Sequence, residues 1–421
     1  MTTIDNLHNK YIPSLISWNL TKKCNLKCPH CYMDAGRKDE KELSTEECFS
    51  LIDELKSLGT EMLILTGGEP LLRRDIYDIS RYASEKGIWV VMGTNGVLVT
   101  QKVAKKMIEC GVKGVGISID SLDPEKHNNF RGGPNAWEYS VKAMDICKKE
   151  GLEILMQTTV MEMNYNEIPE MIAFAREKGA WSFNLYFLVH AGRGKKMNDL
   201  TAVQTHDMLE KLVDIQDEYR PMLVRSKCAP QFKQIAFEKG LAGLESGGCM
   251  AGTQYARITP GGEVTPCPYM DVIAGDLREQ SFSDIWQSSA VFEELRDTSL
   301  LKGRCGVCEM KELCGGCRCR SYAAFDDYLQ EDPACTYQPD GSKEILQFNQ
   351  IIWSEEAQSR LDKIPIEFIR NKVKSGIEAY ALRKNIHIIT NELMQEGLAG
   401  EGRGKMFDKM PSFIKKKKIK N

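Results

Sequence analysis

The chain has 421 residues, enough for two or three domains, and 42% of them are hydrophobic, which is sufficient for packed cores. Its 56 Lys and Arg residues nearly balance 59 Asp and Glu residues, so the overall charge does not indicate binding to nucleic acid. No segment approaches the roughly 20 consecutive apolar residues of a membrane helix, and the first residues do not resemble a signal segment. We therefore expect a cytoplasmic protein without a membrane span.

Short β-rich segments alternate with amphipathic helical segments from about residue 14 to 218. The six predicted strands have the sequences SLISWNL, EMLILTG, WVVMGTN, GVGISID, LEILMQTTV and FNLYFLV. Several of the helical segments between them end at glycine, as helices commonly do. This alternation predicts an α/β fold with a parallel sheet, either open or an incomplete (β/α) barrel, whose chemistry lies at the C-terminal strand ends.

The rest of the chain divides by composition. Residues 219–248 carry few clear signals and are interpreted as a bridge. Residues 249–340 are rich in Cys, Gly and Pro, a composition that favours metal ligation over apolar burial. Residues 341–421 read as a short helical segment, interrupted at Pro365, with a basic tail that we interpret as a solvated terminus. The predicted domains are therefore 1–218, 249–340 and 341–421, with the bridge between the first two.

Fifteen cysteines in a reducing compartment indicate metal ligation or catalysis and not a disulfide framework. Cys48, Cys110 and Cys147 are isolated in helical segments, where we expect buried thiols without a chemical role. Three others, Cys24, Cys28 and Cys31, follow the first strand in a CxxxCxxC spacing. Such a loop can hold three corners of a four-iron cluster and leave the fourth iron open. The alternatives are a zinc site completed by a nearby histidine and an ordinary electron-transfer cluster.

The sequence CxxxCxxCY resembles the signature of the radical S-adenosylmethionine (SAM) superfamily, and further superfamily elements follow at later strand ends. The resemblance covers about residues 14–218. It implies a partial (β/α)6 radical SAM barrel in which Cys24, Cys28 and Cys31 are the catalytic cysteines that bind a [4Fe-4S] cluster. It also implies the following cofactor-binding residues: Tyr32, Gly67, Gly68, Glu69, Pro70, Asn95, Ser118, Asp120, Arg131 and Val189.

Within that resemblance, individual residues have expected roles. Gly67 and Gly68 would let the backbone approach SAM closely, and Glu69 would accept a hydrogen bond from its ammonium group. Arg131 would pair with its carboxylate. The reduced cluster would cleave SAM and produce a 5′-deoxyadenosyl radical, while the protein provides orientation and excludes water.

The second group of cysteines resembles the SPASM extension of this superfamily, which implies one or two auxiliary [4Fe-4S] clusters. The outer cluster would be held by Cys305, Cys308, Cys314 and Cys335. The inner cluster would be held by Cys249, Cys267 and Cys317. The family's commoner Cys-x3-Cys spacing is replaced here by x2 before Cys317, so the fourth inner ligand stays open between Cys319, Cys228 and an unfilled position. Structural zinc knuckles are the alternative.

Several stretches, including FLVHAGRG and SKCAPQF, resemble the heme-biosynthesis branch of SPASM proteins related to NirJ and AhbD. This resemblance implies an enzyme of the radical SAM oxidoreductase or lyase class with an iron tetrapyrrole substrate. It also implies a low-potential electron donor such as ferredoxin or flavodoxin. Our specific prediction is oxidative decarboxylation of Fe-coproporphyrin propionates to give heme. The alternatives are removal of acetate or propionate side chains from a siroheme-derived intermediate, a SPASM-type peptide maturase, and a non-catalytic electron-transfer protein.

Two further features bear on the substrate. Residues 353–397 resemble a small module at the end of a light-independent protochlorophyllide reductase subunit, although a helical appendage for dimer contact is an equal alternative. A substrate with several carboxylates also needs cationic partners, which Arg can bind in bidentate geometry. The candidate cations are His190, Arg193, Lys195, Lys196, Arg225 and Lys227.

Overall fold

The computed structural model describes residues 11–37, 41–239, 248–340, 352–364, 367–383, 386 and 388–399. Its main feature is a ten-stranded sheet with the order β10-β9-β8-β1-β2-β3-β4-β5-β6-β7. The six predicted strands are all present and pair in parallel. They are β1 (Leu15–Asn19), β2 (Met62–Thr66), β3 (Trp89–Thr94), β4 (Val112–Ser118), β5 (Glu153–Val160) and β6 (Ser182–Phe187). The predicted α/β class is confirmed.

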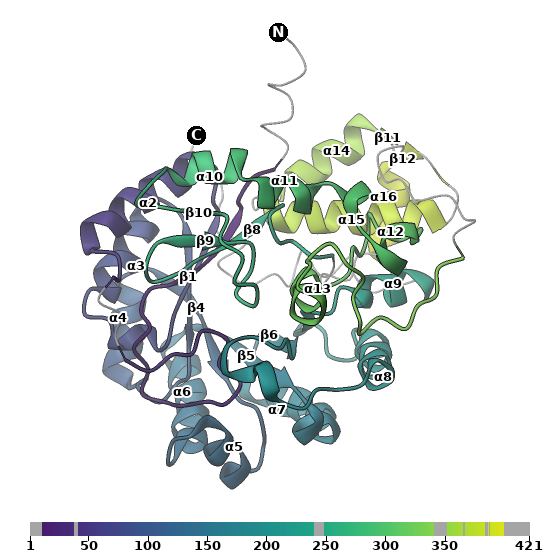
Figure 1. The fold of residues 1–421 in the computed structure, drawn as a ribbon. Helices are drawn as coiled ribbons and strands as arrows, with labels where there is room; N and C mark the ends of the chain where they lie inside the picture. Colours follow the sequence, from purple (N-terminus) through teal and green to yellow (C-terminus); the bar gives the residue numbers. More distant parts are fainter. Residues whose placement is uncertain are drawn as a thin grey trace.

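Helices cover the outer face of this sheet (Figure 1). They are α2 (Thr45–Ser57), α3 (Ile76–Glu85), α4 (Gln101–Glu109), α5 (Pro124–Arg131), α6 (Ala136–Glu150) and α7 (Ile168–Lys178). Local sequence sets their ends: Ser44 and Glu47 form a capping box at the start of α2, and Gly151 ends α6 in the left-handed conformation, with φ of 87°. Alternate strand residues such as Trp18 and Leu63 are fully buried beneath the helices. The other face of each strand is therefore turned inward, toward the site.

Four more strands extend the sheet at its two edges. β7 (Leu223–Lys227) pairs in parallel with β6, and β8 (Tyr255–Ile258) pairs in parallel with β1. β9 (Glu263–Thr265) and β10 (Gly275–Asp276) continue beyond β8 in antiparallel fashion. The segment 219–248, interpreted from sequence as a bridge with few elements, thus supplies a sheet strand. β7 and β8 are at separate positions in the strand order, so the sheet does not close into a barrel.

Short helices connect and follow these strands. They are α8 (Ala202–Asp214), α9 (Gln231–Glu238), α10 (Phe282–Ser288), α11 (Ala290–Arg296), α12 (Gly303–Val307) and α13 (Arg318–Phe325), with the 3-10 helices η1 (Pro70–Leu72), η2 (Glu162–Glu167), η3 (Gly192–Lys196) and η4 (Thr298–Leu300). The cysteine-rich segment lies mostly in loops around α12 and α13. Metal ligands suit such a segment because its apolar core is small.

The C-terminal segment forms a small helical module. It contains β11 (Ile352–Trp353), α14 (Glu355–Asp362), α15 (Glu367–Arg383), β12 (Ile388–Ile389) and α16 (Asn391–Ala399). Its helices share a separate hydrophobic core that includes Leu361, Ile377 and Met394. Figure 1 shows this module beside α9 and α12. Pro365 and the basic tail lie outside the described residues. Among the described helices, none has the length and apolar character needed to cross a membrane.

Candidate active site

The loop that follows β1 carries the three predicted cluster cysteines. Cys24 and Cys31 are partly buried and Cys28 is buried, and all three line one large cavity. The backbone N–H groups of Leu26 and Ala35 donate to the Sγ atoms of Cys24 and Cys31 at 3.5 and 3.4 Å. Burial raises the pKa of Cys24 to about 11 and also raises the pKa of Cys28. These thiols therefore need a nearby positive charge, such as that of bound iron, to be thiolates at neutral pH.

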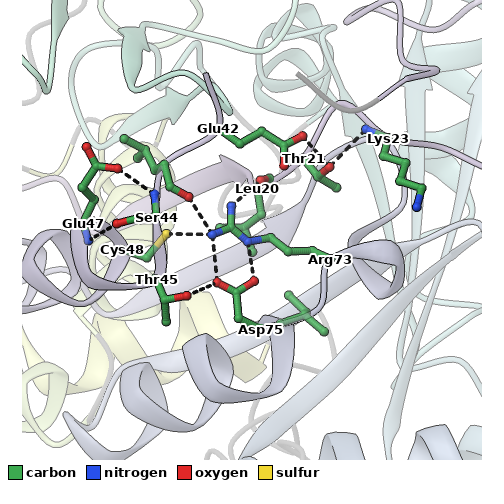
Figure 2. A network of polar contacts seen from close by, with 12 residues as sticks. Leu20, Thr21, Lys23, Glu42, Ser44, Thr45, Glu47, Cys48, Arg73 and Asp75 are labelled. Carbon is green, nitrogen blue, oxygen red and sulfur yellow. Dashed lines mark hydrogen bonds and ion pairs between the residues drawn. The ribbon is translucent and has the colours of Figure 1, made fainter. Parts of the chain in front are cut away.

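A buried arginine fixes the two ends of this cysteine loop (Figure 2). Arg73, which follows η1, donates to the carbonyl oxygen of Leu20 at 2.7 Å and to that of Leu43 at 2.8 Å. Asp75 orients the guanidinium through an ion pair of 2.8 Å, and the hydroxyl of Thr45 donates to Asp75 at 2.6 Å. Because Leu20 precedes the loop and Leu43 ends it, this network sets the width of the loop base.

A second arginine fixes the middle of the same loop. Arg193, in η3 after β6, donates through Nε to the carbonyl oxygen of Cys28 at 2.9 Å. Its Nη1 donates to the carbonyl oxygen of Ala35 at 2.7 Å and to Asp34 at 2.8 Å, and its backbone N–H donates to the carbonyl oxygen of Cys31 at 3.0 Å. Arg193 was predicted from sequence as a partner of substrate carboxylates. That prediction is wrong, because the guanidinium is bound to the cysteine loop.

The segment Gly67–Gly68 allows two backbones to pack closely. A Cβ atom on Gly67 would lie 2.5 Å from the carbonyl oxygen of Thr21, and one on Gly68 would lie 2.3 Å from that of Lys23. Both distances are far below van der Waals contact. The sequence suggested that these glycines make room for SAM. They do line the cavity, but the contact that demands glycine is with the chain leading into the cysteine loop.

Glu69 is fully buried directly behind the cavity wall. Its carboxylate accepts hydrogen bonds from the hydroxyl of Thr94 at 2.8 Å, the N–H of Asn95 at 2.9 Å and the N–H of Leu71 at 3.2 Å. Burial nevertheless raises the pKa of Glu69 to about 7. No ion pair to Glu69 occurs among the residues that the structure describes, so the charge of this carboxylate is solvated by dipoles alone.

Asp120 and Arg131, both predicted as SAM contacts, bind each other. Arg131 Nη2 lies 2.5 Å from Asp120 Oδ2, and the N–H of Thr159 donates to Asp120 Oδ1 at 2.9 Å. Burial would raise the pKa of Asp120, but Arg131 and the other positive neighbours outweigh it and hold that pKa below its usual value. Arg131 Nη1 also lies 3.9 Å from Cys28 Sγ. Asp120 therefore holds the Arg131 guanidinium at the edge of the three-cysteine site.

The cavity has a volume of about 440 Å³ and occupies the inner face of the sheet. Seven of the ten predicted SAM contacts line it, whereas Glu69, Pro70 and Asp120 lie behind its wall. Those that line it are Tyr32, Gly67, Gly68, Asn95, Ser118, Arg131 and Val189. The structure thus brings predicted contacts from the ends of five strands, β1, β2, β3, β4 and β6, to one cavity.

The cavity wall is cationic and aromatic. No Asp or Glu occurs among its described lining residues, which include five cations, namely Lys113, Arg131, Arg193, Arg225 and Lys227. The aromatic lining residues are Tyr32, Trp89, Trp181, Tyr186, Phe187, Tyr255 and Tyr269. Of the predicted substrate cations, Arg225 and Lys227 face this cavity, while His190, Lys195 and Lys196 are not part of its wall. Lys113 was missed; its place at the start of a strand, away from any motif, gave no signal.

Five cysteines gather on the cavity wall contributed by the cysteine-rich segment. They are Cys228, Cys249, Cys267, Cys317 and Cys319. The thiols of Cys228 and Cys317 are neighbours, and the thiol of Cys319 neighbours those of Cys267 and Cys317. Both candidates for the fourth inner ligand therefore lie in the same group.

The four cysteines predicted for the outer cluster line a second, smaller cavity of about 30 Å³. They are Cys305, Cys308, Cys314 and Cys335. Arg318 Nη2 lies 3.5 Å from Cys305 Sγ, and a Cβ on Gly316 would lie 2.9 Å from the same sulfur. In the described part of the chain, no three His, Cys, Asp or Glu side chains converge closely enough to hold a single ion. The four predicted outer ligands nevertheless line one shared cavity, as ligands of a multi-iron cluster would.

Comparisons with known proteins agree with this arrangement. A family model described as the radical SAM superfamily matches residues 18–175, and one described as an iron-sulfur cluster-binding domain (SPASM) matches residues 249–318. A third, described as the proto-chlorophyllide reductase 57 kD subunit, matches residues 353–396.

Two curated relatives come from Methanosarcina barkeri. An AdoMet-dependent heme synthase is 39% identical over 340 residues, covering 78% of this chain and 97% of the relative. An Fe-coproporphyrin III synthase is 31% identical, covering 76% and 87%. Among solved structures, Streptococcus suis SuiB bound to S-adenosylmethionine superposes with a TM-score of 0.64 at 16% identity over 79% of each chain. This last similarity supports the fold alone.

The chain is thus a radical SAM protein with an iron–sulfur-binding SPASM domain, as its motifs predicted. Within that superfamily it belongs to the family of radical SAM heme synthases. SAM and [4Fe-4S] clusters are the cofactors of this class, and the three cysteine groups provide thiol ligands in the places where such clusters would be held.

Proposed function

We propose that this protein modifies the side chains of an iron tetrapyrrole in heme biosynthesis, and that its reaction is oxidative decarboxylation of Fe-coproporphyrin propionates to vinyl groups. The observation that carries the proposal is the cavity wall, which holds Lys113, Arg225 and Lys227 and no Asp or Glu among its described residues. The names of the curated relatives support the same substrate class.

We assign the residues of the site to two groups, those that would bind SAM and those that would bind the tetrapyrrole. Cys24, Cys28 and Cys31 would hold the cluster that binds SAM, which supplies the 5′-deoxyadenosyl radical when bound. Glu69 would complement the SAM ammonium group, because a buried carboxylate without an ion pair is stabilised by an incoming cation. Arg131 would supply positive charge on the side of the SAM carboxylate.

The tetrapyrrole would lie across the cationic and aromatic part of the wall. Arg225 and Lys227 are two residues apart on β7, so their side chains point to the same face of the strand, and both line the cavity. They can pair with propionate carboxylates, and the guanidinium of Arg225 lies 5.3 Å from the ring of Trp181. Tyr186 and Tyr255 offer flat apolar faces to a planar macrocycle. The same surfaces exclude water from the reacting side chain.

The test is anaerobic incubation of the reconstituted protein with SAM, dithionite and Fe-coproporphyrin, followed by mass spectrometry. Decarboxylation to vinyl removes one CO2 and two hydrogens per propionate. One hydrogen atom would go to 5′-deoxyadenosine, the other would leave as a proton, and the remaining electron would leave through the auxiliary clusters. Loss of CO2 alone would indicate replacement of the carboxylate by hydrogen. Modification of a peptide with no change to any porphyrin would transfer the assignment to the maturase alternative.

A matched pair of variants connects this activity to the cavity. Arg225→Leu with Lys227→Met should weaken porphyrin binding, measured by the change in the visible spectrum, and leave uncoupled SAM cleavage in place. Lys196→Ala removes an exposed cation that is not part of the cavity wall and should leave both unchanged. Equal loss of porphyrin binding in the two proteins would argue against the proposed anchors.

A further inference from the structure

The cavity has a second end, opposite the cysteine loop. Leu15, Met62 and Trp89 are the first residues of β1, β2 and β3, and all three line the cavity. Because these strands are parallel, their first residues share one edge of the sheet, and the cysteine loop follows the other. The cavity therefore runs the length of the strands and reaches the N-terminal mouth of the partial barrel.

A side chain from the C-terminal module occupies this mouth. Ile369, in the first turn of α15, packs in one hydrophobic cluster with Leu15, Met62, Ile64 and Trp89. It is also the one residue of the module's described part that lines the cavity. The same side chain contacts the module's own core, so it links that core to the sheet interior.

A charge attraction acts on α15 farther along its length. Glu378 is largely buried and accepts a hydrogen bond from Trp353 Nε1 at 2.9 Å within the module. Lys233 of α9 faces the same carboxylate with opposite charge. Glu378 is nine residues after Ile369, or about 13 Å along a helix with a rise of 1.5 Å per residue. The packing of Ile369 against the sheet is thus accompanied by a charge attraction between α15 and α9.

We propose that α15 closes the N-terminal mouth of the barrel and that Ile369 forms the floor of the reaction cavity, excluding water and dioxygen from it. Radical intermediates and iron–sulfur clusters both require that exclusion. The module matches a family model separate from the radical SAM and SPASM models, so this role does not follow from either. The inference needs only the radical SAM class of the protein and not the tetrapyrrole substrate.

Hydroxyl-radical footprinting read by mass spectrometry measures this closure directly, because it reports the solvent access of individual side chains. In the full-length reconstituted protein, Met62 and Trp89 should be protected. Ile369→Asp should raise their oxidation several-fold and speed the bleaching of the clusters in air. The matched control is Ile388→Asp, which alters the same residue type in the same module at a site that is 55% exposed.

The control should match the wild-type protein in both measurements. Ready oxidation of Met62 and Trp89 in the wild-type protein would overturn the proposal, as would an equal effect of the two variants. If Ile369→Asp does not fold, Ile369→Ala is used in the same comparison, since truncation alone opens the floor. No porphyrin is present in this experiment, so its failure and the failure of the proposed function are distinguishable.

Discussion

Single residues hold the cysteine loop in place, and Arg193 contributes the most contacts to it. Its guanidinium makes three hydrogen bonds to the loop, one of them to a carboxylate. Arg193→Ala should therefore lower both the iron content of the three-cysteine site and SAM cleavage, since bonds of this kind contribute about 1.5–3 kcal/mol each when charged. Arg193→Lys keeps the charge but cannot reproduce the fork, and should recover only part of the loss.

Iron analysis and the 5′-deoxyadenosine yield measure these effects, with Lys196→Ala as the exposed control from the same short helix. A protein lacking Arg193 that keeps all its iron and normal SAM cleavage, yet binds porphyrin weakly, would restore the residue to the substrate site.

We expect Glu69 to make SAM binding depend on pH. Its pKa is raised to about 7 by burial, so the carboxylate gains a proton as the pH falls through 7. SAM requires the anion, and its affinity should therefore fall by about tenfold between pH 8 and pH 6. Glu69→Gln cannot ionise and should bind SAM about ten- to a hundredfold more weakly at pH 8, with a flat pH profile. Titration of the anaerobic protein with SAM at several pH values tests this, and parallel profiles for the two proteins would rule out Glu69 as the titrating group.

At the scale of elements, sequence periodicity was sufficient for the central fold. β1 to β6 alternate with amphipathic helices, and their boundaries are marked by caps and glycines. β7 was missed because its charges at Arg225 and Lys227 suggest a solvated loop, and β8 was missed because it has only four residues. Both side chains are instead partly buried and line the cavity. Hydrophobic alternation along the sequence does not identify strands that line a polar cavity, because the inward faces of these strands are not uniformly apolar.

In the candidate site too, local sequence features were predictable and long-range contacts were not. Contiguous motifs located the three-cysteine loop, the Gly-Gly-Glu segment and the outer cysteines. Long-range contacts were not predictable, because no local pattern records that Arg73 reaches both Leu20 and Leu43 or that Arg193 returns to the loop. The hydrogen-bond partners of Arg73 and Arg193 are set by the folded structure and not by the spacing of residues in the sequence.

The inner cysteine group has five thiols where a four-iron cluster needs at most four. Cys228 and Cys319 both contact the thiol of Cys317, from the bridge and from α13 respectively. We expect either thiol to complete the site, so Cys228→Ser and Cys319→Ser should each keep nearly all the iron, while the double variant loses about four irons per chain. Iron analysis and electron paramagnetic resonance measure the outcome. Loss of four irons in one single variant would identify the unique ligand, and no loss in the double variant would show an unfilled position.

At the scale of the whole molecule, the cavity exists because the sheet stays open. β7 and β8 do not pair, and the cysteine-rich segment covers the inner face between them (Figure 1). The cavity consequently has the three-cysteine loop on one wall and the inner cysteines on another. A closed eight-stranded barrel would have an interior just wide enough to be filled by its own side chains. An open sheet with a second segment across it leaves room for the cavity of about 440 Å³ seen here.

Three separate cysteine groups in one chain set the total iron. If each holds a four-iron cluster, the anaerobically reconstituted protein contains about twelve irons per chain. Changing Cys24, Cys28 and Cys31 together to Ala should remove about a third of the iron and all SAM cleavage, because the other two groups lie on different segments. Changing Cys305, Cys308 and Cys314 to Ala should remove a similar amount of iron but leave SAM cleavage measurable. Zinc in place of iron in the natively purified protein, confined to the 249–335 segment, would contradict the auxiliary clusters and leave the SAM site standing.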